Sequence, residues 1–157
     1  MNKIIEVDFL PRDTNAALSW PNSFGRWGMK QKRRILIVDD DPGTTRLVKV
    51  LLEKTGQYEV LEENDATKAH PTARNFRPDV ILLDIVMPDT DGGEVAARIE
   101  ADPELQTMPV IFLTALVTRA EAKSALNIQG HPFLAKPISI PELIDAIEEH
   151  LAARAAS

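Results

Sequence analysis

Short, wholly apolar runs alternate with longer segments of helical periodicity along most of this chain, and this alternation restricts the fold more than any other feature. The runs at residues 35–38, 80–83 and 110–113 contain no polar residue. Strands that are apolar on both faces are typical of a parallel sheet covered by helices on each side. The alternation therefore predicts a doubly wound, three-layer α/β domain with right-handed crossovers.

Two further strands complete a set of five. Tyr58–Glu63 alternates apolar and polar residues, and Phe133–Ala135 is a short strand before Lys136. Pro71 lacks an amide hydrogen, so it should kink or shorten the second helix, and Gly56 is expected to end the first. Helices are expected over residues 42–55, 66–76, 92–101, 119–126 and 141–153.

Polar side chains stand at the carboxyl ends of four of these strands: Asp39, Asp40, Asp41, Asp84, Thr114 and Lys136. Because the carboxyl ends of parallel strands meet at one edge of an open α/β sheet, we expect these groups to share a shallow crevice. Carboxylates gathered there repel one another, and their pKa values rise unless a cation joins them. Lys136 alone cannot balance them, so the cluster predicts a bound cation.

Oxygen donors without histidine or cysteine favour a hard divalent ion, and Mg²⁺ suits a few carboxylates that leave positions open for water and phosphate. A lysine and a hydroxyl beside such a site form a cradle for a phosphoryl group. An aspartate facing that cradle can be a nucleophile and form an aspartyl-phosphate. The predicted chemistry is therefore phosphoryl transfer.

The segments ILIVDDDP, VILLDIVMPDTDG, VIFLTA and FLAKP resemble, in this order and at similar separations, the receiver domain of response regulators in two-component signalling. The resemblance covers roughly residues 33–153. It implies a flavodoxin-like (βα)5 domain whose five parallel strands follow the order 2-1-3-4-5. One such segment would be weak evidence, whereas four in order are specific.

The resemblance also implies the roles of the acidic residues. Asp84 would accept a phosphoryl group from a phosphohistidine. The protein ligands of Mg²⁺ would be the carboxylates of Asp39, Asp40 and Asp84 and the backbone carbonyl of Val86. Such a protein is a phospho-acceptor that catalyses its own phosphorylation and dephosphorylation, and is not otherwise an enzyme.

Three other residues match the switching parts of the family. Thr114 would hydrogen-bond a phosphoryl oxygen and move toward it, and Lys136 would pair with the phosphoryl charge. Phe133 matches the switch aromatic, which changes between outward and inward positions. The Lys136–Pro137 bond is expected to be cis, as in the family.

Some residues suit ordinary structural roles better. Asp41, just before Pro42, is expected to cap a helix. Asp89 and Asp91 lie in a turn before the next helix, and turn or capping roles are expected for them. The histidines lie far apart in sequence, lack metal-ligand spacing and are expected at the surface: His70, His131 and His150.

Val86 and Leu116 follow the site on two strands, and both are apolar. We hypothesise that they position an attacking water poorly and slow dephosphorylation.

Composition limits the alternatives. The absence of cysteine excludes a disulfide scaffold, a thiol nucleophile and an iron–sulfur cluster. No stretch is long and apolar enough to span a membrane, so a cytoplasmic location is expected.

The net charge of −6 is unevenly distributed. Residues 1–34 hold seven basic and three acidic residues, giving +4, and the remaining residues hold 11 basic and 21 acidic residues, giving −10. The acidic part is a poor candidate for a nucleic-acid binder.

Residues 1–32 form a basic leader with both tryptophans, and residues 33–157 form the expected domain. Two origins of the leader stay open: translation starts at Met29 and the leader is an artefact, or its aromatic and basic residues dock on a partner or on the domain. Neither a signal peptide nor an internal repeat is recognisable.

The predicted protein is a stand-alone response regulator, since only one helix is expected after Lys136 and leaves no room for an output domain. Its partners would be a sensor histidine kinase or a histidine phosphotransfer protein and an unknown downstream protein. It would be a monomer or a weak, phosphorylation-dependent dimer.

The alternative functions are an interaction module that signals without phosphorylation, an aspartyl-phosphate hydrolase and a flavodoxin-like cofactor protein. Asp39–Asp41 would repel the phosphate of a flavin, and a P-loop NTPase is disfavoured because GxxxxGK[ST] does not occur.

Overall fold

The computed structural model describes residues 30–115 and 128–157. The chain divides into two units, Met1–Gln31 and Lys32–Ser157, and the second contains all the elements described below. Three predicted features lie outside the described residues: almost all of the leader, the helix predicted over residues 119–126, and the side chain of Leu116. The boundary predicted between a leader of residues 1–32 and a domain of residues 33–157 stays a prediction.

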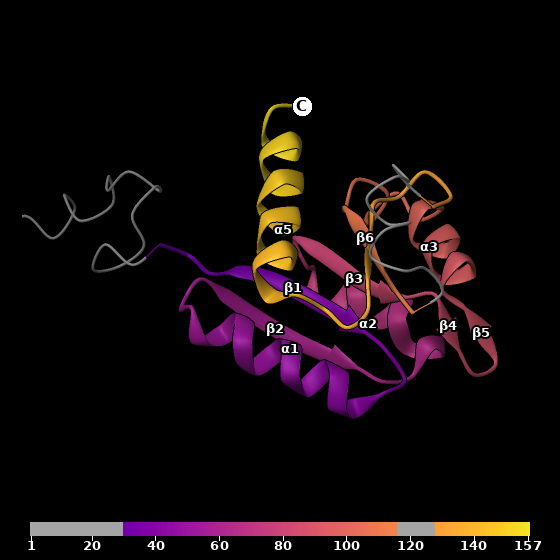
Figure 1. Cartoon of the computed structure of the whole chain (residues 1–157). Helices are drawn as coiled ribbons and strands as arrows, with labels where there is room; N and C mark the ends of the chain where they lie inside the picture. Colours follow the sequence, from indigo (N-terminus) through magenta and orange to yellow (C-terminus); the bar gives the residue numbers. More distant parts are fainter. Residues whose placement is uncertain (1–29, 116–127) are drawn as a thin grey trace, which may run out of the picture. The chain divides into compact units, whose positions relative to one another are not determined.

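Five parallel strands form one sheet in the order β2-β1-β3-β6-β7 (Figure 1). The predicted order 2-1-3-4-5 is confirmed, because β6 and β7 are the fourth and fifth strands of this sheet. The strands are β1 (Arg33–Val38), β2 (Tyr58–Glu63), β3 (Val80–Asp84), β6 (Val110–Thr114) and β7 (Phe133–Ala135).

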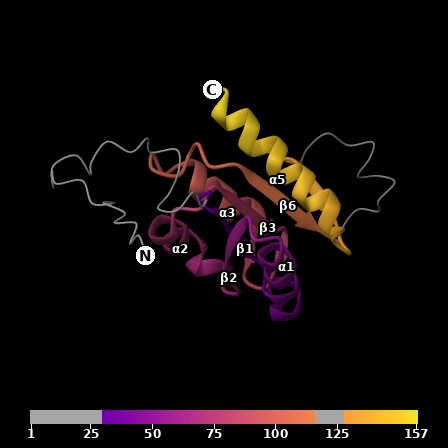
Figure 2. The same ribbon diagram turned by 90° about the vertical axis from the view of Figure 1, so that its left-hand side faces the viewer.

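Helices cover both faces of the sheet, as predicted. Those described are α1 (Pro42–Lys54), α2 (Ala69–Phe76), α3 (Gly92–Glu100) and α5 (Ile140–Ala155). The core beneath α1 and α5 contains Ile35 and Ile37, whereas the core beneath α2 and α3 contains Leu36 and Val38. Figure 2 shows α5 and α2 on opposite sides of the sheet. Successive residues of β1 thus enter different cores, and all four are fully buried, which explains why the strand is apolar throughout.

The helix predicted over residues 66–76 is divided. Ala66–Lys68 form a 3₁₀ turn, and α2 begins only at Ala69. Pro71 therefore lies in the first turn of α2, where an amide hydrogen would have no partner within the helix. The prediction that Pro71 shortens this helix is confirmed.

The segment after β3 contains more structure than the turn predicted there. Val86–Met87 (β4) and Thr90–Asp91 (β5) pair as a short antiparallel ribbon, with Asp89 in the left-handed region at φ 63°. Asp91 caps α3 by accepting a hydrogen bond from the amide of Gly93. This capping role and that of Asp41 at the start of α1 were predicted and are confirmed.

Among the described residues, no helix combines the length and the apolar character needed to cross a membrane.

Candidate phosphoryl-acceptor site

The first and third strands bring the predicted carboxylates together. Val38 and Leu83 are register partners on adjacent strands, so Asp39 and Asp84, the next residues, emerge at the same edge of the sheet. Asp39, Asp40 and Asp84 each offer a carboxylate oxygen, and these oxygens lie within 4.8 Å of one another. Asp39 and Asp84 are buried, with 0% and 5% of their surface exposed, whereas Asp40 is exposed. The prediction of an acidic cluster is therefore met by these three side chains.

Lys136 follows β7 and points into this cluster. Its Nζ atom donates a hydrogen bond of 2.6 Å to Oδ2 of Asp39 and lies 3.5 Å from Oδ1 of Asp84. Burial opposes the charge of Lys136, but the hydrogen bond and charge of Asp39, with the charge of Asp84, outweigh it and raise its pKa. The lysine is therefore held as a cation between the two buried carboxylates.

The neighbours of Asp84 do not fully stabilise the negative charge of its ionised carboxylate. Burial, and then the negative charge of Asp39, raise its pKa to about 6; Lys136 and the backbone amide of Val86 only partly oppose this. A raised pKa means that the ionised form of the carboxyl group is destabilised, here chiefly by burial and then by the neighbouring charge of Asp39. The site thus has the electrostatic character of one that accepts a further cation or donates electrons to an electrophile.

A partly buried hydrogen-bond network fixes the backbone beneath the carboxylates. Asn64, just after β2, donates to the backbone carbonyl of Asp39 at 2.8 Å and to the hydroxyl of Thr45 at 3.0 Å. Thr45, fully buried in α1, donates in turn to a carboxylate oxygen of Glu62 at 3.0 Å. The amide of Asp41 donates to Oδ1 of Asp39 at 3.0 Å. Both the main chain and the side chain of Asp39 are therefore held in place.

Gly92 is a site residue that sequence reasoning missed. A Cβ atom at this position would lie 2.3 Å from the carbonyl oxygen of Asp84 and 2.8 Å from Cα of Ile85. The amide of Gly92 donates to the carbonyl of Ile85 at 2.8 Å. Only a residue without a side chain lets the start of α3 approach the acceptor strand this closely.

The switch candidates lie on β6 and β7. Thr114 is fully buried at the end of β6, and its backbone carbonyl accepts a hydrogen bond of 2.7 Å from the amide of Lys136. Phe133 is 9% exposed and packs in the core under α2 and α3, which is an inward position. The Lys136–Pro137 bond is cis, as predicted.

The three histidines were expected at the surface; each is partly exposed, and each has a hydrogen-bond or ion-pair partner. His70 Nε2 lies 2.8 Å from Oδ2 of Asp102, and His150 Nδ1 lies 2.7 Å from the carbonyl of Ala146. The His131 side chain is only 16% exposed, pairs with Glu100 at 2.7 Å and contacts the edge of Phe112. The partners of His70 and His131 come from distant parts of the chain, so an argument from metal-ligand spacing cannot find them.

Val86 lies beside the site with 58% of its surface exposed. Its backbone amide bonds to Asp84, which places the residue next to the acceptor. Leu116, the other apolar residue invoked for slow dephosphorylation, is not among the described residues.

Comparisons with known proteins agree with this geometry. The family model of the response regulator receiver domain matches residues 35–148. The polar-differentiation response regulator DivK of Brucella anthropi is 33% identical over 119 residues, covering 76% of this chain and 96% of that protein. The DNA-binding dual master transcriptional regulator RpaA of Synechocystis is 35% identical over 111 residues, but the match covers 71% of this chain and only 46% of RpaA.

A solved structure gives the same result for the fold. The CheY-like receiver domain protein of Methanospirillum hungatei superposes with a TM-score of 0.68 at 28% identity, over 80% of this chain and 98% of that one. Together with the sheet order and the family match, this shows that the chain belongs to the response regulator receiver domain family of two-component signalling.

Proposed function

We propose that this protein is a single-domain response regulator that accepts a phosphoryl group on Asp84. The observation that carries the proposal is the position of Asp84, a buried carboxylate with a raised pKa, 3.5 Å from the Nζ atom of Lys136. Thr114 ends the neighbouring strand, next to β3 in the sheet. These side chains provide a nucleophile, a cation and a hydroxyl at one strand edge.

The donor set fits Mg²⁺. Three carboxylate oxygens from Asp39, Asp40 and Asp84 lie within 4.8 Å of one another, and Lys136 leaves part of their charge unbalanced. Hard oxygen donors of this kind suit Mg²⁺, and the backbone carbonyl of Val86 would complete the protein ligands. When bound, Mg²⁺ would neutralise charge on the phosphoryl oxygens.

The transfer step needs the ionised form of Asp84. With a pKa of about 6, most of the carboxyl group is ionised at pH 7 even without a metal ion. One of its oxygens attacks the phosphorus of a phosphohistidine; the new O–P bond forms as the P–N bond breaks, and the electron pair leaves with the imidazole nitrogen. Lys136 offsets the charge that develops on the phosphoryl oxygens, and the Thr114 hydroxyl hydrogen-bonds one of them.

The proposed output is a shift between two conformations. Thr114 and Lys136 are joined by a backbone hydrogen bond between β6 and the end of β7, and Phe133 lies at the start of β7. Movement of Thr114 toward the phosphoryl group would therefore act on the strand that carries the aromatic switch. The partners we propose are a sensor histidine kinase or phosphotransfer protein and a downstream protein that binds the altered surface.

A receiver-like interaction module that signals without phosphorylation is the second candidate, and one experiment separates the two. The full chain is incubated with Mg²⁺ and acetyl phosphate, and its intact mass is measured. We expect one added phosphoryl group in the parent protein and none in Asp84→Asn. Absence of the adduct from the parent would favour the interaction module.

A further inference from the structure

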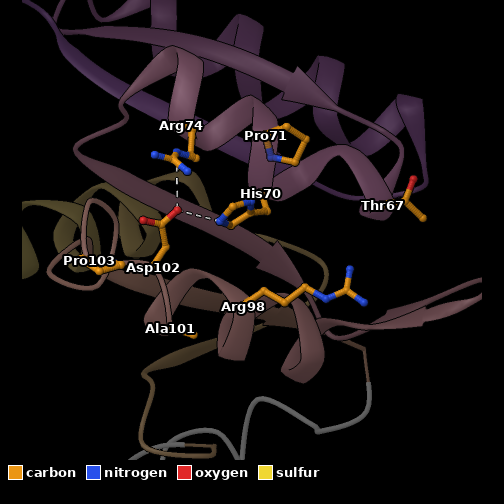
Figure 3. Close-up of a pocket in the computed structure, with 8 residues that line it drawn as sticks. All are labelled: Thr67, His70, Pro71, Arg74, Arg98, Ala101, Asp102 and Pro103. Atoms are coloured by element: carbon orange, nitrogen blue, oxygen red, sulfur yellow. Dashed lines mark hydrogen bonds and ion pairs between the residues drawn. The ribbon is translucent and has the colours of Figure 1, made fainter.

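An open pocket with both polar and apolar lining lies away from the acidic edge, between α2 and α3, on the face of the sheet opposite α1 and α5. It has a volume of about 530 Å³. The 3₁₀ turn Ala66–Lys68 and α2 bound it on one side, and the end of α3 with the turn that follows bounds it on the other (Figure 3). This volume lies within the range of pockets that hold small molecules. None of the residues proposed to take part in phosphoryl transfer lines it.

One carboxylate in this cavity already has its partners. The Asp102 side chain is 8% exposed; His70 Nε2 lies 2.8 Å and Arg74 Nε 3.6 Å from its Oδ2 atom. The backbone amide of Glu104, then His70 and Arg74, lower the pKa of Asp102. Asp102 therefore stays ionised, and its contacts hold the His70 and Arg74 side chains on its own side of the pocket.

Arg98 has no such partner. Figure 3 shows His70 and Arg74 turned toward Asp102, while the Arg98 side chain extends along the other side of the cavity, away from that carboxylate. Within the described part of the chain, the Arg98 guanidinium makes no ion pair and no hydrogen bond. Arg98 is exposed to solvent, so its charge is available to a ligand, although residues 35–157 carry 21 acidic against 11 basic residues.

The lining as a whole favours an anion. The lining carries two guanidinium groups and an imidazole but one carboxylate, Asp102; Glu104, just outside the lining, pairs with Arg74 and leaves Arg98, among the described residues, as the unpaired charge. The remaining wall includes Pro71, Ala101 and Pro103. Planar guanidinium groups bind phosphate and carboxylate oxygens through paired hydrogen bonds. The apolar wall can cover the carbon skeleton of a ligand that a bare inorganic ion lacks.

We propose that this cavity is a binding site for a small organic anion bearing phosphate or carboxylate groups, held chiefly by the guanidinium of Arg98. Arg74 contributes the second positive charge, although it is shared with Asp102 and Glu104. The site goes beyond the proposed function, because it uses neither Asp84 nor the metal.

The test follows the amide NMR resonances of the full chain, without Mg²⁺ or a phosphodonor, at constant ionic strength. The probes are glycerol 3-phosphate and citrate, with glycerol as an uncharged control. We expect saturable shifts centred on His70, Arg74, Arg98 and Asp102 with at least one of the anions, and the tighter probe identifies the preferred head group. Glycerol should produce none of these shifts.

Matched variants decide whether the site is specific. Arg98→Gln should weaken binding by about tenfold or more, since it removes a charge-assisted contact, while Arg154→Gln at the exposed end of α5 removes the same charge elsewhere. Asp84→Asn should bind the probes as the parent does, because Asp84 does not line this pocket. The proposal is overturned if neither anion gives saturable shifts at these residues, or if Arg98→Gln binds no more weakly than Arg154→Gln.

Discussion

The Nζ atom of Lys136 lies 2.6 Å from Oδ2 of Asp39, a carboxylate whose surface is completely buried. The same ammonium is 3.5 Å from the nearest oxygen of Asp84. The lysine is thus hydrogen-bonded to the aspartate after β1 and only approaches the aspartate at the end of β3. Burial, and then the charge of Asp39, raise the pKa of Asp84, and the more distant ammonium only partly opposes them; Asp39 has a direct partner.

Replacement of Lys136 by methionine should destabilise the fold. It would leave Asp39 as a buried charge without its hydrogen-bonded cation, a change that typically costs about 3 kcal/mol or more. Urea unfolding at pH 7 measures the difference. Lys54→Met, at the exposed end of α1, is the matched control and should change the free energy of unfolding little; equal effects of the two variants would show that the Lys136–Asp39 pair does not stabilise the protein.

Asp84→Asn should stabilise the metal-free protein at pH 7. Because the folded-state pKa of Asp84 is raised from 3.8 to about 6, the folded state binds its proton more tightly than the unfolded chain does. Stability contributed by that proton is fully present below pH 3.8 and is lost as the pH rises through about 6. The neutral amide avoids this loss, which amounts to up to about 3 kcal/mol.

Two comparisons check the origin of this effect. The gain in the free energy of unfolding should shrink as the pH falls toward 3.8, and Asp41→Asn, which keeps a capping side chain, should show no such gain. Added Mg²⁺ should stabilise the parent protein more than Asp84→Asn. A gain that did not depend on pH would contradict the electrostatic explanation.

Gly92→Ala should displace the acceptor strand. Its new methyl group would meet backbone atoms of Asp84 and Ile85, which cannot rotate away, so we expect a loss of roughly 1–3 kcal/mol in stability and slower phosphorylation by acetyl phosphate. Gly93→Ala is the control, since its nearest neighbour is the end of the flexible Gln129 side chain. Similar phosphorylation rates in the two variants would argue against a positioning role for Gly92.

Val86→Asn should shorten the lifetime of the phosphorylated protein. Val86 is exposed beside Asp84, and an amide there could orient a water molecule that valine cannot, which we expect to speed hydrolysis several-fold. The decay of the phosphorylated species is followed by intact mass after the donor is removed. If the phosphorylated variant lived as long as the phosphorylated parent, the hypothesis that Val86 slows dephosphorylation would be wrong.

The sequence predicted most of the sheet and the charged part of the site because both follow from short-range patterns. Apolar runs mark the buried strands, and the polar residue after each run must lie at the carboxyl edge. Asp39, Asp84 and Lys136 come from separate strands, yet the parallel topology alone brings them together.

Other features depend on tertiary contacts that no local pattern records. The need for glycine at position 92 comes from the backbone of β3 passing close by. The bonds from Asn64 to Asp39 and Thr45 need the register between β1 and β2. His70 and Asp102 are distant in sequence and meet only because α2 and α3 pack on the same face.

The central claim is that Asp84 carries the phosphoryl group, and chemical mapping of the modified residue tests it most directly. Protein treated with acetyl phosphate and Mg²⁺ is reduced with borohydride, which converts an aspartyl phosphate to homoserine, and its peptides are sequenced by mass spectrometry. We predict homoserine at position 84 in the parent and in Asp41→Asn, and at no position in protein treated without the donor. Homoserine at another aspartate, or its absence from the treated parent, would contradict the claim.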